Sequence, residues 1–413
     1  MHHEIGLIST IAVGLVYAVV GGYIASRLRL PPLVGYLLAG IADGPFTPGF
    51  VADTKLAPQL AEIGVILLMF GVGLHFSVRD LVAVRRVAVP GAFAQIVITV
   101  AVTYLVAHCW GWGLSSGLVL GLALSVASTV VLLRGLENQG LLYSDSGRIA
   151  VGWLIVEDLF TVLVLVVLPE LAVLLSDGTA NTAVSNHSDT QLLVAVLAAL
   201  VKLALFAVFM LVLGTRFLRW LLSRVSETQY RELFTLTVVA AAIGIGFGAA
   251  ELFGLSFALG AFFAGVVVEE SGYGERAATE LHALQDIFTA LFFVAIGMLF
   301  DPAILFREPL EVLAIVLIII LVKLIAAFLI VRLLGHPVNT AFVIAAGLAQ
   351  IGEFSFILSE LGIQLRLLPD ETQSLIVAGA LVSIALNSFL LRGARIVQDR
   401  RKLPISGIGG IES

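Results

Sequence analysis

Charged residues are scarce in this 413-residue chain, where Asp, Glu, Lys and Arg make up 13% of the total. Soluble domains carry about 25%. Cysteine occurs once, at Cys109, which excludes a disulfide within the chain and leaves no basis for a cysteine-ligated metal. No Walker motif, basic nucleic-acid-binding face or Ser/His/Asp order stands out. These absences argue against a nucleotide-driven enzyme, a serine hydrolase and a nucleic-acid-binding protein.

Hydrophobic residues are correspondingly abundant: they make up 60% of the chain, and the mean hydropathy is +1.08. A membrane-spanning helix needs about 20 mainly apolar residues. The runs of this length predict an all-α membrane protein with thirteen spans in the lipid bilayer. We expect the spans at 5–26, 32–43, 58–76, 88–108, 113–133, 149–174, 191–214, 230–249, 252–268, 286–300, 309–334, 339–361 and 372–392.

The distribution of basic residues predicts the orientation, because Lys and Arg favour cytoplasmic loops. With the N-terminus outside and thirteen spans, eighteen of the 23 Lys and Arg residues fall on the inner side and three on the outer side. The C-terminus is then cytoplasmic. The polar stretch 176–190, which has no basic residue, becomes an external loop.

Three pairs of segments indicate an internal repeat. "EIGVILLMFGVGLHF" (62–76) resembles "DIFTALFFVAIGMLF" (286–300), "GYLLAG" (35–40) resembles "GAFFAG" (260–265), and "GLALSVASTVVLL" (121–133) matches "GLAQIGEFSFILS" (347–359). The offsets are 224, 225 and 226 residues, so the three pairs keep nearly one spacing.

Each offset contains seven spans, an odd number, so the second copy would enter the membrane upside down. Inverted repeats of this kind are typical of alternating-access transporters, whose sites lie near the bilayer midplane. We therefore divide the chain into a first repeat (1–175), an external loop with a linker helix (176–229), a second repeat (230–395) and a cytoplasmic tail (396–413).

Polar residues lie in the middle of two corresponding spans. Ser125, Ser128 and Thr129 interrupt 113–133, and Gln350 and Glu353 interrupt 339–361. Such residues also serve as ordinary hydrogen-bonding contacts between helices. Because they coincide in both copies, we expect two discontinuous helices, whose free carbonyls can coordinate a cation.

Two adjacent acids, Glu157 and Asp158, lie halfway along the apolar span 149–174, and Lys323 lies at mid-depth in 309–334. An unpaired charge at the bilayer centre costs at least about 2.5–3.5 kcal/mol. Neighbouring residues on a helix point about 100° apart. We expect Glu157 to pair with Lys323 and Asp158 to face a cavity, although a buried ion pair that only orients helices stays an alternative.

A cavity carboxylate flanked by hydroxyl groups can hold a proton or a monovalent cation, but hardly both. Competition for one site would produce exchange of K⁺ or Na⁺ for H⁺ by a transporter that is not an enzyme and holds no tightly bound cofactor. Two alternatives remain: a gated potassium efflux system with channel-like flux, and an organic-anion symporter.

Several motifs together closely resemble the monovalent cation:proton antiporter-2 family, in its Kef-type branch. They are "PPLVGYLLAG", "LAEIGVILLMFGVGLHFS", "STVVLL", "GWLIVEDL", "RELFTL", "SFALGAFFAG", "FFVAIGMLFDP" and "LAQIGEFSFIL".

The resemblance implies the sodium/proton-antiporter fold with two crossed discontinuous helices, in a homodimer of the bacterial inner membrane. The first three spans and the spans 230–249, 252–268 and 286–300 would form the dimer interface. Asp158 would be the ion- and proton-binding aspartate beside Ser128, Thr129, Gln350 and Glu353, with Ser125 in support.

The resemblance also implies that Glu157 bonds Lys323, as in electrogenic relatives. In the glutathione-gated potassium relatives glutamine is typical at the position of Glu157. Relatives continue into a regulatory nucleotide-binding domain, which we expect to be absent here.

Overall fold

The computed structural model describes residues 5–47, 56–74, 78–175 and 189–400, and all regular structure in these ranges is helical. Nine helices in the described ranges are long and apolar enough to cross a membrane, and a tenth span arises if the bent pair Val338–Leu348 and Glu353–Gln364 counts as one. Shorter apolar helices lie at Pro32–Asp43 and Gln59–Leu74. The chain is therefore a multi-span membrane protein. This count gives fewer spans than the thirteen we predicted.

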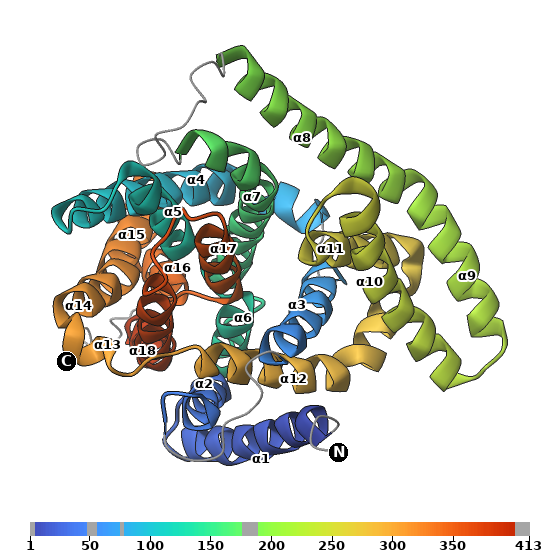
Figure 1. Cartoon of the computed structure of the whole chain (residues 1–413), viewed down its shortest axis with the longest axis horizontal. Helices are drawn as coiled ribbons and strands as arrows, with labels where there is room; N and C mark the ends of the chain where they lie inside the picture. Colours follow the sequence, from blue (N-terminus) through green and yellow to red (C-terminus); the bar gives the residue numbers. More distant parts are fainter. Residues whose placement is uncertain (1–4, 48–55, 75–77, 176–188, 401–413) are drawn as a thin grey trace, which may run out of the picture.

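One group of helices, here called the panel, combines the N-terminal helices with three from the second half of the chain. In it α1 packs on α2, α2 and α3 pack on α12, and α3 and α10 pack on α11 (Figure 1). The bounds are α1 (Ile5–Arg27), α2 (Pro32–Asp43), α3 (Ala57–Leu74), α10 (Arg231–Phe253), α11 (Phe257–Val268), the π-helix η2 (Glu269–Tyr273) and α12 (Gly274–Met298).

A second group of helices, the core, contains most of the buried polar residues in the described ranges. Here α4 packs on α5, α7 and α15, while α16 packs on α7, α15 and α18, and α17 packs on α5. The bounds are α4 (Val78–Cys109), α5 (Leu114–Ser125), α6 (Thr129–Asn138), α7 (Asp145–Leu175), α13 (Ile304–Arg307), α14 (Pro309–Leu317), the π-helix η3 (Ile318–Val322), α15 (Lys323–Leu333), α16 (Val338–Leu348), α17 (Glu353–Gln364) and α18 (Thr372–Arg400).

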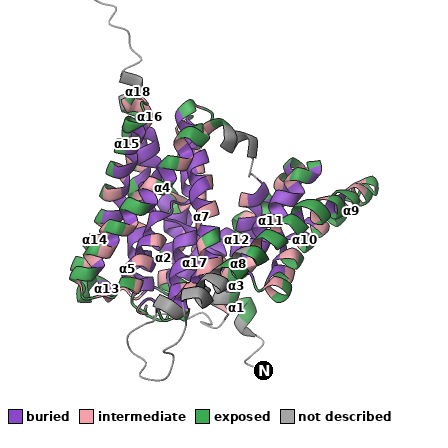
Figure 2. Cartoon of the chain, turned by 90° about the horizontal axis from the view of Figure 1, so that it is seen from above, coloured by how far each residue is buried: buried purple, intermediate pink, exposed green. Residues whose placement is uncertain are grey.

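Between α7 of the core and α10 of the panel, the chain forms one long helix along an edge of the molecule (Figure 1). It consists of α8 (Asp189–Phe209), the π-helix η1 (Met210–Gly214) and α9 (Thr215–Glu227). The side chains of α9 are mostly exposed or half-buried, in contrast to the buried interiors of the core and panel (Figure 2). Of the external loop predicted at 176–190, residues 176–188 lie outside the described residues, as do residues 401–413 of the predicted tail.

Close helix packing in the panel depends on pairs of glycines. A Cβ on Gly73 of α3 would collide with α11 at Gly265, and a Cβ on Gly40 of α2 would collide with α12 at Gly297. Small residues let helices approach closely in a membrane. The predicted repeat relates Gly40 to Gly265 and Gly73 to Gly297, so it relates these two contacts to each other.

The prediction that a span begins at 286 was wrong about the start of the helix, since α12 begins at Gly274. Ala277 and Leu281 are fully buried, whereas Glu275 and His282 are exposed. The charged residues of this stretch reach solvent from one face while the other face packs. A search for apolar runs misses such an amphipathic segment.

Candidate functional site

The helix breaks predicted from the polar residues are present. The chain is extended at Val126 and Ser128 between α5 and α6, and helical structure is lost again over 349–352 between α16 and α17. The two breaks touch: Ser128 N donates to Gln350 Oε1 at 3.0 Å, and Gln350 Nε2 donates to Ser128 O at 3.1 Å. The first bond satisfies the Ser128 N–H, which an unbroken helix would satisfy itself, while Ser128 O also accepts from Leu132 N of α6 at 3.1 Å.

A glycine permits this close contact. A Cβ on Gly352 would collide with the Cα and Cβ atoms of Ser128. Ser128 also caps α6, because its Oγ accepts a hydrogen bond from Val131 N at 3.2 Å. The same Oγ donates to Glu353 Oε2 at 3.0 Å. One serine therefore joins the start of α6 to the start of α17.

Asp158 lies on α7 beside these breaks, with 3% of its surface exposed. Thr129 Oγ1, at the first residue of α6, donates to Asp158 Oδ2 at 2.9 Å. The second carboxylate oxygen, Oδ1, is buried and has no hydrogen-bond partner among the described residues. Two more buried oxygens close to the breaks, Glu353 Oε1 and Ser355 Oγ, are unpartnered in the same sense. The site therefore has three oxygen atoms that could bind a cation and that accept no hydrogen bond from the described residues.

Glu157, the neighbour of Asp158, is fully buried and has a different set of contacts. It accepts hydrogen bonds from Gln95 Nε2 at 2.7 Å, from Ala127 N at 3.0 Å and from Trp153 Nε1 at 3.1 Å. As expected for adjacent helical residues, the two acids do not share a partner. Glu157 is fixed by three donors, whereas Asp158 is held by one.

Lys323 is also fully buried, at the junction of η3 and α15. Its Nζ donates to Gln350 O at 2.7 Å, which places the positive charge on a free carbonyl of the second break. Lys323 and Glu157 interact electrostatically. The hydrogen bonds of each go elsewhere, so the expected pairing takes the form of proximity rather than a hydrogen-bonded ion pair.

The predicted set of site residues differs from the observed contacts at three residues. Ser125 is buried, but its Oγ bonds Leu122 O at 2.8 Å within its own helix, so this contact does not link it to the other site residues. Gln95 and Trp153 were missed. Gln95 is an isolated amide in an apolar run, and Trp153 lies one helical turn before Glu157. Either signal could have indicated a partner for a buried acid.

A cavity of about 1020 Å³ between core and panel reaches Asp158 and Thr129. Its wall includes Gln285 and Asp286 of α12, and Arg134 of α6 joins the panel there through a 2.9 Å ion pair with Asp286. Water and small ions can therefore approach Asp158 from the side where these residues lie.

A second cavity of about 510 Å³ has Glu62 of α3 and Glu360 of α17 in its wall. It is also lined by Phe292 and Phe356, whose rings lie 6.3 Å apart, but not by Asp158. Glu62 and Asp286 begin corresponding segments of the predicted repeat, and each lines one of the two cavities. Asp158 is thus open to only one of them.

Residues 14–393 match the family described as sodium/hydrogen exchanger, transmembrane. The chain belongs to that family. Against YbaL of Escherichia coli (strain K12), named as a cation/proton antiporter, identity is 54% over 94% of this chain and 69% of YbaL. K(+) efflux antiporter 4 of Arabidopsis thaliana is 31% identical over 94% of this chain and 64% of its own length.

The fold of this chain is also found in a solved structure. The sodium proton antiporter MjNhaP1 from Methanocaldococcus jannaschii matches with a TM-score of 0.68 and 18% identity, over 94% of this chain and 97% of MjNhaP1. At that identity the likeness shows the antiporter fold alone. The resemblance to Kef-type antiporters is confirmed by the sequence relatives, which are transporters rather than enzymes.

Proposed function

We propose that this chain exchanges a monovalent cation, K⁺ or Na⁺, for protons, and that Asp158 binds either ion. The observation that carries the proposal is a buried carboxylate at the wall of an open cavity: Asp158 lines the cavity, and its Oδ1 atom has no partner among the described residues. A carboxylate in low dielectric binds a proton or a cation to offset its charge. Thr129 and Ser128 supply hydroxyl oxygens beside it, and Gln350 and Glu353 support the second break.

Alternating access would follow from movement of the core against the panel. The two cavities lie between core and panel, and a shift of the core would expose Asp158 to the cavity of Glu62 and Glu360. The panel would provide the dimer interface through α1–α3 and α10–α12. Each of the two groups draws helices from both predicted repeats, 1–175 and 230–395, and the paired glycine contacts in the panel support that symmetry.

The thirteen-span topology is part of the proposal. The longest apolar helix, Phe257–Met298, has 42 residues, which is about twice what one membrane crossing needs. The chain leaves helical geometry at Gly272, where φ is 88°. Counting that helix as two spans, the bent pair as one and the two shorter apolar helices as spans gives thirteen. The basic-residue bias then places the N-terminus outside and the C-terminus in the cytoplasm of a bacterial inner membrane.

Potassium and sodium remain the two candidate ions. A relative named as a K(+) efflux antiporter favours potassium, and the matched family, described as sodium/hydrogen exchanger, favours sodium. Channel-like potassium efflux is the second candidate function. The three buried acids Glu157, Asp158 and Glu353 argue against an organic-anion symporter.

The test is exchange in proteoliposomes that hold an imposed pH gradient and a pH-sensitive dye. Addition of K⁺ or Na⁺ to wild-type protein should collapse the gradient, and Asp158→Asn should show no response while running as the same oligomer on gel filtration. A wild-type protein that responds to no alkali cation overturns the proposal. Conductance of single-channel size in planar bilayers would instead identify the efflux pathway.

A further inference from the structure

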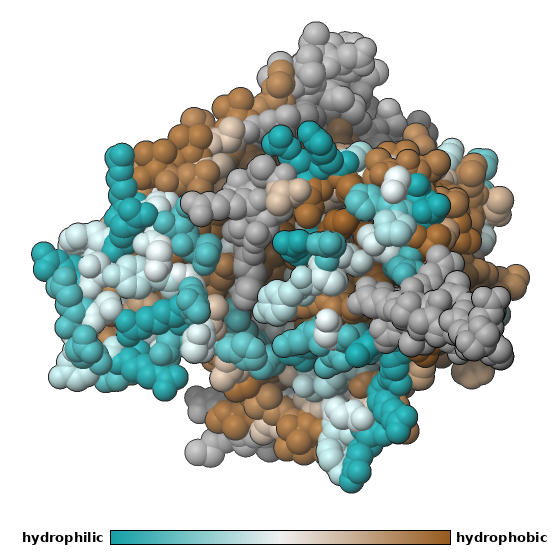
Figure 3. Space-filling view, turned by 180° about the vertical axis from the view of Figure 1, so that it is seen from behind, coloured by the Kyte–Doolittle hydropathy of each residue, from teal (hydrophilic) through white to brown (hydrophobic). Residues whose placement is uncertain are grey.

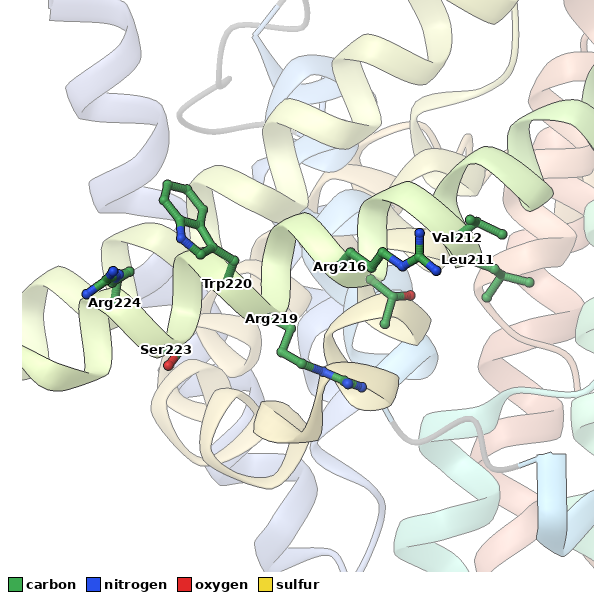
Figure 4. Close-up of a pocket in the computed structure, with 8 residues that line it drawn as sticks. Leu211, Val212, Arg216, Arg219, Trp220, Ser223 and Arg224 are labelled. Atoms are coloured by element: carbon green, nitrogen blue, oxygen red, sulfur yellow. The ribbon is translucent and has the colours of Figure 1, made fainter.

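One face of the long edge helix carries a groove of about 590 Å³ that changes from apolar to cationic along its length. Leu211 and Val212 line one end, and Arg219 and Arg224 line the other. The fourteen residues from Leu211 to Arg224 correspond to about 20 Å of helix. Figure 4 shows these side chains projecting from the helix, with Arg216 between the two ends. The groove therefore has the polarity of an amphiphile.

The positive charge at the cationic end of the groove is not neutralised by acidic residues of the groove. Within the described ranges, three arginines and no acidic residue line the groove. Arg216 is exposed and has no partner among the described residues, while Arg219 Nη2 bonds the main-chain oxygen of Glu270 at 2.9 Å. Arg224 forms only an exposed pair with Glu227 at 3.4 Å, and such pairs contribute little. An anionic ligand could engage the free arginine without breaking a buried contact.

A buried hydroxyl lies between the two ends. Thr215 Oγ1 is inaccessible to solvent and has no hydrogen-bond partner among the described residues, although Thr215 lines the groove. Buried hydroxyl groups are normally hydrogen-bonded, so an unpartnered one points to a missing acceptor or donor. Rotation of the Thr215 side chain toward the groove would bring this hydroxyl to a ligand oxygen beside Arg216.

The proposed orientation of α9 puts the groove at a membrane surface. Leu218 and Leu222, on the other side of α9, are buried against the rest of the protein. Trp220 is 57% exposed, as expected for tryptophans at the boundary between hydrocarbon and water. Seen from behind, the edge of the molecule on the side of α9 is mostly hydrophilic, whereas the upper rim is mostly hydrophobic (Figure 3).

We propose that this groove binds an anionic glycerophospholipid of the cytoplasmic leaflet. Its phosphodiester lies on Arg216 and Arg219 and one acyl chain runs past Leu211 and Val212. Guanidinium groups bind phosphate through two parallel hydrogen bonds, and basic clusters at the cytoplasmic ends of spans recognise anionic lipid headgroups. The proposal rests on the proposed orientation of α9 and not on ion exchange, so either can fail alone.

Native mass spectrometry of the purified protein in detergent tests the site. The probes are phosphatidylglycerol, phosphatidylcholine with the same acyl chains, and glycerol 3-phosphate. Wild-type protein should bind phosphatidylglycerol about tenfold more tightly than phosphatidylcholine, and Arg216→Gln/Arg219→Gln should remove that preference. The matched control, Arg85→Gln/Arg395→Gln, removes two exposed arginines elsewhere and should bind like wild type.

Four results would overturn the lipid site. They are an unchanged preference in Arg216→Gln/Arg219→Gln, an equal loss in the control, equal binding of glycerol 3-phosphate, and a change of oligomeric state in place of lipid binding. A second readout locates the lipid: brominated phosphatidylglycerol should quench a fluorescence component that Trp220→Phe lacks. Equal quenching of this component by brominated phosphatidylcholine contradicts the proposal.

Discussion

Ser128 Oγ donates a hydrogen bond to Glu353 Oε2 at 3.0 Å, joining the two helix breaks across 225 residues of sequence. Both side chains are buried, with Ser128 at 0% and Glu353 at 1% exposure. Ser128 also caps α6, and Glu353 is the first residue of α17. A change at this bond therefore affects the starts of both α6 and α17, which lie next to Asp158.

A double-mutant cycle should measure this bond. We expect Ser128→Ala and Glu353→Leu, which removes the acceptor oxygens, to couple by about 1–3 kcal/mol in the free energy of unfolding, the range for a buried bond to a carboxyl group. Denaturant unfolding in mild detergent gives the four values. A matched cycle of Ser359→Ala with Glu353→Leu should be additive, because Ser359 bonds Gln373 instead. Additivity in the first cycle would contradict the bond.

Gly352→Ala should separate the two breaks. The added methyl group collides with the backbone of Ser128, and overpacking of this kind costs about 1–3 kcal/mol or more. We expect a lower melting temperature and loss of most exchange activity in proteoliposomes. Gly244→Ala is the control, since a Cβ there meets nothing within 4 Å and alanine favours the helix by about 0.5–1 kcal/mol. Equal behaviour of the two variants would refute the close contact.

Glu157→Gln should affect stability more than cation binding. The amide keeps one acceptor oxygen but turns an NH₂ group toward donors from Gln95, Trp153 or Ala127, at a cost of about 1–3 kcal/mol. Thermal unfolding and cation titration on one preparation separate the two effects. Glu137→Gln, at an exposed residue, should leave both unchanged. Complete loss of cation binding in Glu157→Gln would exchange the roles we give to Glu157 and Asp158.

Arg134→Gln should change the conformational equilibrium with little effect on stability. Its ion pair with Asp286 joins core to panel but is 42% and 48% exposed, so we expect at most about 1 kcal/mol in stability. Removing the pair favours the state in which Asp158 faces the Glu62 cavity. A cysteine placed at Glu62, with Cys109→Ser, should then react faster with a thiol reagent.

Arg148→Gln provides the control for that experiment. Arg148 lines the same cavity, but its partner Asp145 is three residues away on α7. The pair therefore lies within the core and should not affect movement against the panel. If the cysteine at position 62 also reacts faster in Arg148→Gln, the effect comes from the lost charge and not from the contact between core and panel.

The sequence contained enough to predict the breaks. Ser128 and Gln350 are polar residues at matching places in two apolar runs, and a membrane excludes such residues unless they have a partner. The sequence could not show that Lys323 bonds the carbonyl of Gln350, because a main-chain acceptor leaves no trace in residue identity. Gln95 was missed because it meets Glu157 only when α4 and α7 pack together. Trp153 lies one turn before Glu157 on the same helix, so the sequence held that signal and the prediction overlooked it.

The central claim is that one carboxyl group, Asp158, binds a proton and a cation in competition. Isothermal titration of wild-type protein and Asp158→Asn with K⁺ and with Na⁺ over a series of pH values tests it most directly. Protons compete as the pH falls, so the wild-type apparent affinity should weaken, approaching about tenfold per pH unit once Asp158 is mainly protonated. Asp158→Asn should bind neither ion. Cation binding that ignores pH, or that survives in Asp158→Asn, would contradict the account.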